Sequence, residues 1–209
     1  MKRGYFLSVE GGEGVGKSTQ ISALAEAIRD QGHDVIVTRE PGGTDGAEVI
    51  RQLLLGGSAG RWEPRTEAML FAAARSDHVA RLIKPAIESG KWVIADRFLD
   101  SSRAYQGGGS GIDDAEILKL HEIGSQGYMP DRTLVLELPE EEANRRAVLR
   151  DGNEADRIGG RESAFHQMVH DAFRRFAGDD PTRVRLIDAS GSPDDVTARL
   201  VTAVSDLLE

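Results

Sequence analysis

The stretch Gly11–Thr19, with the sequence GGEGVGKST, constrains the fold of this chain more than any other. It follows a short apolar run that ends at Glu10, and an amphipathic run begins at its end. The spacing G-x-x-x-x-G-K-[ST] predicts a phosphate-binding loop, because glycines let several backbone N–H groups point inward at the start of a helix. A glycine-rich turn that binds nothing is the alternative, and the order strand, loop, helix disfavours it.

The predicted ligand of this loop is the phosphate chain of a nucleotide. Lys17 can reach the β- and γ-phosphates, and the Ser18 hydroxyl can ligate Mg²⁺. The residues predicted to surround the phosphates are Gly11, Gly12, Glu13, Gly14, Val15, Gly16, Lys17, Ser18 and Thr19. The loop alone leaves open whether the phosphate goes to water, to a protein or to a small molecule.

Composition narrows the class of protein. The chain has 209 residues, enough for one α/β domain with a sizeable core, and 35 acidic against 26 basic residues give a net charge of −9. This charge disfavours binding to nucleic acid or to an anionic membrane. Because there is no cysteine, disulfides and thiolate sites are excluded. No signal peptide or membrane-spanning run is apparent, so we expect a cytoplasmic protein.

Strand-like and helix-like stretches alternate, which predicts an α/β fold with a five-stranded parallel sheet flanked by helices. Strands are expected over residues 5–10, 34–39, 91–96, 133–138 and 183–188. Helices are expected over 17–31, 47–55, 64–90, from 113, over 139–150, up to 176 and from 193. Pro85 should kink or split the long helix, and the glycines at 107–111 predict a flexible turn. No repeat or linker is apparent, so residues 1–209 are expected to form a single domain.

Asp96 ends the third predicted strand and is a candidate metal ligand. A carboxylate at the carboxyl end of a buried strand, in the sheet that carries the phosphate loop, is where a Mg²⁺ partner is expected. An ordinary aspartate that caps the following turn is the alternative. The adjacent Arg97 favours the functional interpretation, because a guanidinium there can hold a second phosphate.

Phe71 and Arg75 are spaced i, i+4 on the long helix and therefore project from one face. A ring beside a guanidinium suits a planar base that is stacked on one side and hydrogen-bonded at its edge. Phe71 could equally belong to the core face of this helix. Arginines from four elements, at or near the expected carboxyl end of the sheet, further suggest that the acceptor is itself a phosphate: Arg39, Arg51, Arg75 and Arg97.

A polar segment of about residues 150–162 carries Arg150, Arg157 and Arg161 among acidic residues and glycines. It is either a solvated loop or a mobile lid that supplies positive charge during phosphate transfer. The variable positions of the phosphate loop contain no basic residue. Charge needed at transfer must therefore come from elsewhere, which favours a lid.

Several segments together resemble the bacterial thymidylate kinases, which are P-loop nucleoside monophosphate kinases. The segments are VEGGEGVGKST (9–19), TREPGGT (38–44), FAAAR (71–75), DRFLDSSRAYQGGG (96–109), PDRTLVLEL (130–138) and the pair Asp156-Arg157. The resemblance covers the whole chain. It implies a P-loop kinase architecture with a lid, ATP-dependent phosphorylation of dTMP with Mg²⁺, and a homodimer.

The resemblance also implies roles for individual residues. For dTMP these are Phe71, Arg75, Ser102 and Gln106 at the base, Glu13 and Tyr105 at the sugar, Arg51 and Arg97 at the phosphate, with Glu40, Pro41 and Ser101 nearby. ATP would be held by the phosphate loop, by Arg146 and by the loop after Asp188, and the metal by Ser18 and Asp96. Catalytic charge would come from Lys17, Arg97, Arg157 and Arg150. An insert at 151–154 departs from the family pattern.

Two other functions remain open from the residues. One is a kinase for a different monophosphate or for a deoxynucleoside. The other is a P-loop switch or ATPase that acts through a partner, and the AYQGGG and FAAAR segments disfavour it.

Overall fold

The structure, a computed structural model, describes residues 3–58, 60–139, 141–143, 145–146 and 163–208. Its centre is a five-stranded parallel sheet with the strand order β2-β3-β1-β4-β5. The strands are β1 (Phe6–Gly11), β2 (Val35–Arg39), β3 (Trp92–Asp96), β4 (Arg132–Glu137) and β5 (Val184–Asp188). The predicted fold class is confirmed, and each strand begins and ends within one residue of the position expected from the sequence.

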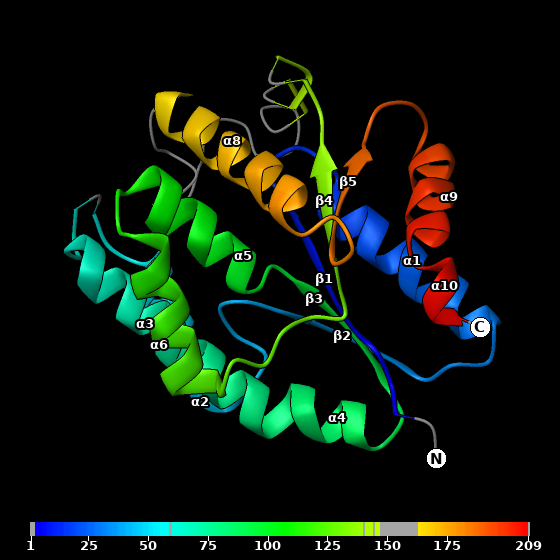
Figure 1. The fold of residues 1–209 in the computed structure, drawn as a ribbon, viewed down its shortest axis with the longest axis horizontal. Coiled ribbons are helices and arrows are strands. Elements are labelled where there is room, and N and C mark those ends of the chain that lie inside the picture. Colours follow the sequence, from blue (N-terminus) through cyan, green and yellow to red (C-terminus); the bar gives the residue numbers. More distant parts are fainter. Residues whose placement is uncertain (1–2, 59, 140, 144, 147–162, 209) are drawn as a thin grey trace.

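The three central strands are buried almost throughout, whereas the edge strands β2 and β5 are partly exposed. This difference explains the nearly continuous apolar character of β1, since both of its faces are covered. Leu7 and Val9 pack on one face, in the same core as Leu24 of α1 (Lys17–Asp30). Phe6 packs on the other face, with Ile83 and Phe98. Helices therefore cover both sides of the sheet (Figure 1).

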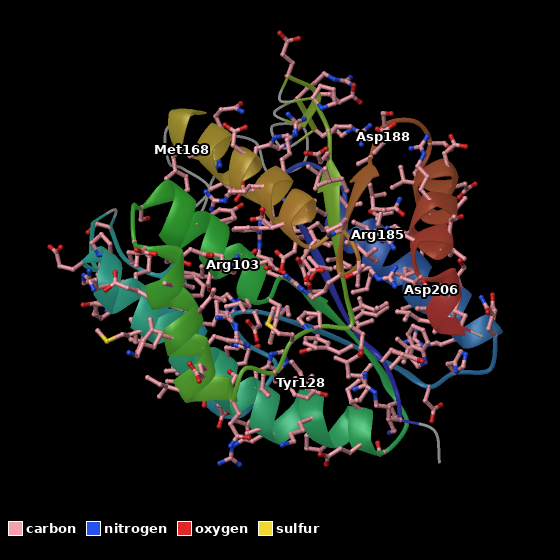
Figure 2. The ribbon with its side chains drawn as sticks, viewed as in Figure 1. Arg103, Tyr128, Met168, Arg185, Asp188 and Asp206 are labelled. Atoms are coloured by element: carbon pink, nitrogen blue, oxygen red, sulfur yellow. The ribbon has the colours of Figure 1, made fainter. Side chains whose placement is uncertain are left out.

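On one side of the sheet lie α1, α9 (Pro193–Ala203) and α10 (Ser205–Leu208) (Figure 1). The helix α9 begins with a capping box, in which the Ser192 hydroxyl accepts from the Asp195 backbone N–H while the Asp195 carboxylate accepts from Ser192. At the far end of this layer, Arg132 of β4 donates to Asp206 at 2.8 Å. Figure 2 shows Asp206 on α10, well away from Asp188, which ends β5.

The long helix of the opposite side is interrupted where expected. It comprises α3 (Pro64–His78), a π-helical turn η1 (Val79–Ile83) and α4 (Lys84–Glu88). Proline has no N–H, and its ring clashes with a carbonyl of the preceding turn. The change of hydrogen bonding immediately before Pro85 accommodates both effects. The preceding helix α2 (Asp45–Leu55) begins two residues earlier than expected, because Thr44 caps it by accepting from Ala47 N.

The segment after β3 differs from the expectation. It is helical from Leu99 to Gly109, as α5 (Leu99–Ser102) and the π-helical η2 (Arg103–Gly109), where we expected the glycines to form a flexible turn. A Cβ on Gly109 would lie 2.3 Å from the ring of Phe165 on α8 (Ser163–Asp179). The close approach of α8, which requires glycine, offsets the low helix propensity of this stretch. Asp113 caps α6 (Asp114–Ser125) as predicted.

A buried ion network joins α5 to the sheet. The Asp100 carboxylate is fully buried and accepts from Arg183 at 2.6 Å and from Arg103 at 3.0 Å. Arg103, labelled in Figure 2, also donates to Asp114 at 2.7 Å. Burial raises the pKa of Asp100, but the hydrogen bonds and charges of the two arginines outweigh it and hold that pKa below its usual value. The start of α5 is thereby fixed against β4 and β5.

Among the described residues, no helix combines the length and apolar character that a membrane crossing needs. The predicted helix over 139–150 is described only in part, and the segment 150–162 with Arg150, Arg157 and Arg161 lies outside the described residues.

Candidate active site

A cavity of about 640 Å³ opens at the carboxyl ends of the central strands. Most of the residues predicted from the sequence to bind donor, acceptor or metal lie in its lining. They are Glu13, Gly14, Val15, Gly16, Lys17, Ser18, Thr19, Glu40, Pro41, Arg51, Phe71, Arg75, Asp96, Arg97, Ser101, Ser102, Tyr105 and Gln106. Arg39 and Arg146 line it too. Residues from distant segments of the chain therefore meet at one place, as the sequence predicted.

The phosphate loop connects β1 to α1, and its glycines adopt conformations that other residues avoid. Gly11, Gly14 and Gly16 have φ of 131°, 73° and 92°. A Cβ on Gly11 would also lie 2.6 Å from the Leu136 carbonyl oxygen. Both observations explain why the sequence needs glycine at the start of the loop.

Lys17 lies over this loop. Its Nζ donates to the carbonyl oxygens of Gly12 at 2.8 Å and Gly11 at 3.1 Å. Burial, together with the positive charge of Arg97, lowers the pKa of Lys17 to about 7, and nearby carboxylates act in the opposite direction. The ammonium is thus held where it can exchange carbonyl oxygens for phosphate oxygens.

Ser18 and Asp96 fit a divalent cation. Both line the cavity, and Asp96 Oδ1 is buried without a hydrogen-bond partner among the described residues. A buried carboxylate oxygen without a partner is unfavourable unless another ligand satisfies it. One carboxylate and one hydroxyl beside a phosphate loop are a suitable ligand set for a metal that is otherwise coordinated by water and phosphate.

Arg97 follows Asp96 in a left-handed conformation, with φ of 69°. Its Nη1 donates to Ser101 Oγ at 3.1 Å, and its guanidinium carbon lies 5.0 Å from the centroid of the Tyr105 ring. Burial opposes its positive charge, but Tyr105, Asp96 and Glu10 together raise the pKa of Arg97 above its usual value. Arg97 is therefore a permanent positive charge in the lining of the cavity.

Arg75 is buried and held on three sides. Nε donates to Glu40 Oε2 at 2.8 Å, and Nη2 donates to Ser102 Oγ at 2.7 Å and to the Phe98 carbonyl oxygen at 3.3 Å. Phe71, four residues earlier, is half-buried and lines the cavity instead of the core. Of the two interpretations left open by the sequence, this placement favours the one in which Phe71 contacts a ligand.

Other cavity residues are anchored in similar ways. Gln106 Nε2 donates to Glu67 Oε1 at 3.0 Å, and Arg51 Nη1 donates to the Pro41 carbonyl oxygen at 2.7 Å. Arg39 pairs with Glu48 at 3.2 Å on an exposed surface, which makes it the least enclosed of the four predicted arginines.

Some residues of the site were missed from the sequence. Glu40 also contacts His78, whose Nδ1 lies 3.0 Å from Glu40 Oε1 and whose Nε2 lies 2.8 Å from Thr38 Oγ1. Further residues line the cavity without having been predicted individually: Gln20, Leu55, Phe98, Ala189, Gly191, Pro193 and Val196. Four of these follow β5, at the edge of the sheet where the other strands end, in or directly after the loop that the family resemblance had assigned to ATP as a segment.

The parallel sheet, the loop between β1 and α1, and the arginine-lined cavity facing that loop define a P-loop nucleoside monophosphate kinase. A model of the thymidylate kinase family matches residues 9–200. The chain belongs to the thymidylate kinase family. Members of this family use ATP, which implies a divalent metal.

The similarity to individual relatives extends over nearly the whole chain. The thymidylate kinase of Rhizorhabdus wittichii is 60% identical over 205 residues, covering 98% of this chain and 99% of the relative. The thymidylate kinase of Caulobacter vibrioides is 47% identical over 208 residues, covering 100% of this chain and 97% of the relative. A crystal structure of thymidylate kinase from Ehrlichia chaffeensis superposes with a TM-score of 0.78 at 30% identity, covering 97% of this chain and 99% of that one.

The lowered pKa of Lys17 predicts that nucleotide binding takes up a proton. With a pKa of about 7, Lys17 is mostly neutral at pH 8, and bound phosphates favour its charged form. Calorimetry of ATP binding in buffers of different ionisation enthalpy should therefore show uptake of about one proton at pH 8. At pH 6, where Lys17 is already charged, uptake should be small. Equal uptake at both pH values would contradict the assignment.

Proposed function

We propose that this protein transfers the γ-phosphate of ATP to dTMP, giving dTDP and ADP, with Mg²⁺ held by Ser18 and Asp96. One observation carries the proposal: the cavity that contains the phosphate loop also contains Phe71, Arg75 and the other residues that would bind the acceptor. The relatives named thymidylate kinase, 60% and 47% identical over almost the full chain, support the same activity.

The resemblance to thymidylate kinases suggests a role for each of the acceptor residues. Arg75 and Gln106 would hydrogen-bond to the edge of thymine, with Phe71 against its face and Ser102 beside it. Arg51 and Arg97 would bind the phosphate of dTMP. Glu13 would approach the sugar 3′-hydroxyl, and the Tyr105 ring would pack against the sugar and disfavour a 2′-hydroxyl. The described contacts that support these roles are the anchors of Arg75, Gln106 and Arg51.

The chemistry needs alignment and charge more than proton transfer. A phosphate oxygen of dTMP is already an anionic nucleophile, so no general base is required. When bound, Mg²⁺ neutralises charge on the β- and γ-phosphates. Lys17 and Arg97, which both line the cavity, would stabilise the charge on the transferred group.

The remaining positive charge would come from Arg157, with Arg150 as a second candidate, in the lid of about residues 150–162. The absence of basic residues at positions 12–15 of the phosphate loop supports this assignment. Arg146, which lines the cavity, and the loop after β5 would contact the adenosine part of ATP.

We further propose that the chain forms a single domain, acts in the cytoplasm and associates as a homodimer through its helices. Exposed apolar side chains lie on three helices that pack side by side, α2, α3 and α6 (Figure 1). They are Val49 and Leu53 on α2, Met69 on α3, and Leu118 and Ile123 on α6. A second copy of the chain would cover such a surface.

A coupled assay of ADP release tests the activity. We expect turnover with dTMP, and none with thymidine, which lacks the nucleophilic phosphate. With dUMP, which lacks one methyl group, kcat/KM should fall by about 10–200-fold. Chelation of divalent metal should stop the reaction, and Mg²⁺ should restore it. ADP release that is independent of any acceptor would instead indicate an ATPase or a switch.

Substitution Arg157→Ala tests the lid. If Arg157 stabilises the transferred phosphate, kcat should fall by roughly 10³–10⁵-fold while the KM for dTMP stays nearly unchanged. Arg145→Ala provides a control, because Arg145 is exposed and pairs only weakly with Glu142, at 3.4 Å. A kcat of Arg157→Ala close to that of Arg145→Ala would refute the role of the lid arginine.

Sedimentation equilibrium tests the dimer. The unchanged protein should sediment with twice the chain mass, and Met69→Glu should shift it toward the monomer, since a charge would be buried at the interface. Met168→Glu is a matched control, because Met168 is 45% exposed, compared with 52% for Met69, and lies on α8 (Figure 2). Equal effects of the two substitutions would count against the interface on α2, α3 and α6.

A further inference from the structure

Glu10 is a completely buried carboxyl group at the end of β1, directly before the phosphate loop. Taking a carboxyl group out of water is unfavourable unless hydrogen bonds or charges compensate it. Burial, aided by Asp100, raises the pKa of Glu10 to about 8, against the opposing effect of its hydrogen bonds and of Arg97. No role for it follows from the G-x-x-x-x-G-K-[ST] pattern, which begins one residue later.

Both oxygens of Glu10 contact the segment that follows β3. Oε1 accepts from the backbone N–H of Phe98 at 2.8 Å, and Oε2 accepts from the Ser101 hydroxyl at 2.5 Å. Phe98 is the N-cap of α5, and its own side chain makes no capping hydrogen bond. From a neighbouring strand, Glu10 therefore accepts the N–H of the N-cap residue, which the third helical residue accepts in a capping box.

These contacts enclose Arg97. A left-handed conformation is unfavourable for a residue other than glycine, so the surrounding structure must impose it. The backbone N–H of Arg97 donates to the Val9 carbonyl oxygen at 3.0 Å, and the backbone N–H of Phe98 donates to the Glu10 side chain. Two consecutive residues of β1 thus hold two consecutive amides around Arg97.

The side chain of Arg97 is connected to Glu10 as well. The Ser101 hydroxyl donates its single proton to Glu10 and accepts from Arg97 Nη1, so it links the two side chains. The other side of the guanidinium faces the Tyr105 ring. The direction of the Arg97 side chain consequently depends on where Glu10 holds Ser101.

We propose that Glu10 is a positioning residue, which imposes the left-handed turn at Arg97 and, through Ser101, aims its guanidinium at the phosphate of the acceptor. The identity of that acceptor as dTMP rests on the proposed function. Lys17 instead donates to the backbone carbonyl oxygen of Gly11, at 3.1 Å, and this contact does not involve the Glu10 side chain. A change of the Glu10 side chain should therefore weaken the binding of the acceptor phosphate by Arg97, in addition to any effect on the core.

Two readouts test this inference, namely steady-state kinetics and hydrogen exchange of the peptide that contains residues 97–102. Glu10→Leu keeps a similar volume but removes both acceptors. It should raise the KM for dTMP by at least about tenfold, lower kcat, leave the KM for ATP within about threefold, and speed exchange in this peptide. Glu10→Gln keeps an acceptor for Phe98 N–H and a polar contact to Ser101, and should largely restore both properties.

Ser8→Ala is the matched control for a purely structural effect. Ser8 is two residues earlier on the same face of β1, is fully buried, and makes one side-chain hydrogen bond, to Thr133 Oγ1 at 3.0 Å. It should change neither the KM for dTMP nor exchange over residues 97–102. If Glu10→Leu fails to fold, Ser101→Ala decides, because it removes the link between Glu10 and Arg97 and should raise the same KM.

Unchanged KM and exchange in Glu10→Leu, or in Ser101→Ala where the first variant does not fold, would overturn the inference. Equal changes in Ser8→Ala would do the same, by showing that any lost hydrogen bond in β1 has this effect. If the unchanged protein does not phosphorylate dTMP, the proposed function fails. The exchange of residues 97–102 still reports whether Glu10 holds this segment.

Discussion

The parallel pairing of β1 with β3 is the constraint on which the site depends. Its register places Val9 opposite Asp96, so the phosphate loop and the Asp96-Arg97 pair begin side by side at one edge of the sheet. The pairing of β2 with β3 places Arg39 opposite the same Asp96 and brings Glu40 and Pro41 to this edge. The fold thus brings the groups proposed to bind donor, metal and acceptor to one edge of the sheet before any side chain contributes a specific contact.

Buried carboxyl groups then fix the arginines that face the cavity. Glu10 at the end of β1 holds Arg97 through Ser101, and Glu40 after β2 holds Arg75 directly at 2.8 Å. A buried cation needs such partners, and each partner removes rotamers that the long side chain would otherwise populate. The cost of ordering these charges is met during folding, which leaves less reorganisation for the moment when a substrate binds.

Many elements of the fold could be predicted from the sequence, because they depend on local patterns of residues. The strands, the cap at Asp113 and the interruption near Pro85 follow from periodicity, capping chemistry and the geometry of proline. The helix over Leu99–Gly109 could not be predicted from local patterns, because only the close packing of α8 favours its glycines. Glu10 and His78 were missed for a similar reason, since their partners are 88 to 91 and 38 to 40 residues away in the chain.

Glu40, which holds Arg75, is itself held in place by its surroundings. His78 lies between Glu40 and Thr38, and a Cβ on Gly43 would lie 2.5 Å from both His78 Nε2 and Thr38 Oγ1. The loop after β2 must therefore carry glycine at this point to let its backbone close over the pair. Gly43 thus permits the packing that fixes Glu40, and through Glu40 the orientation of Arg75 in the cavity.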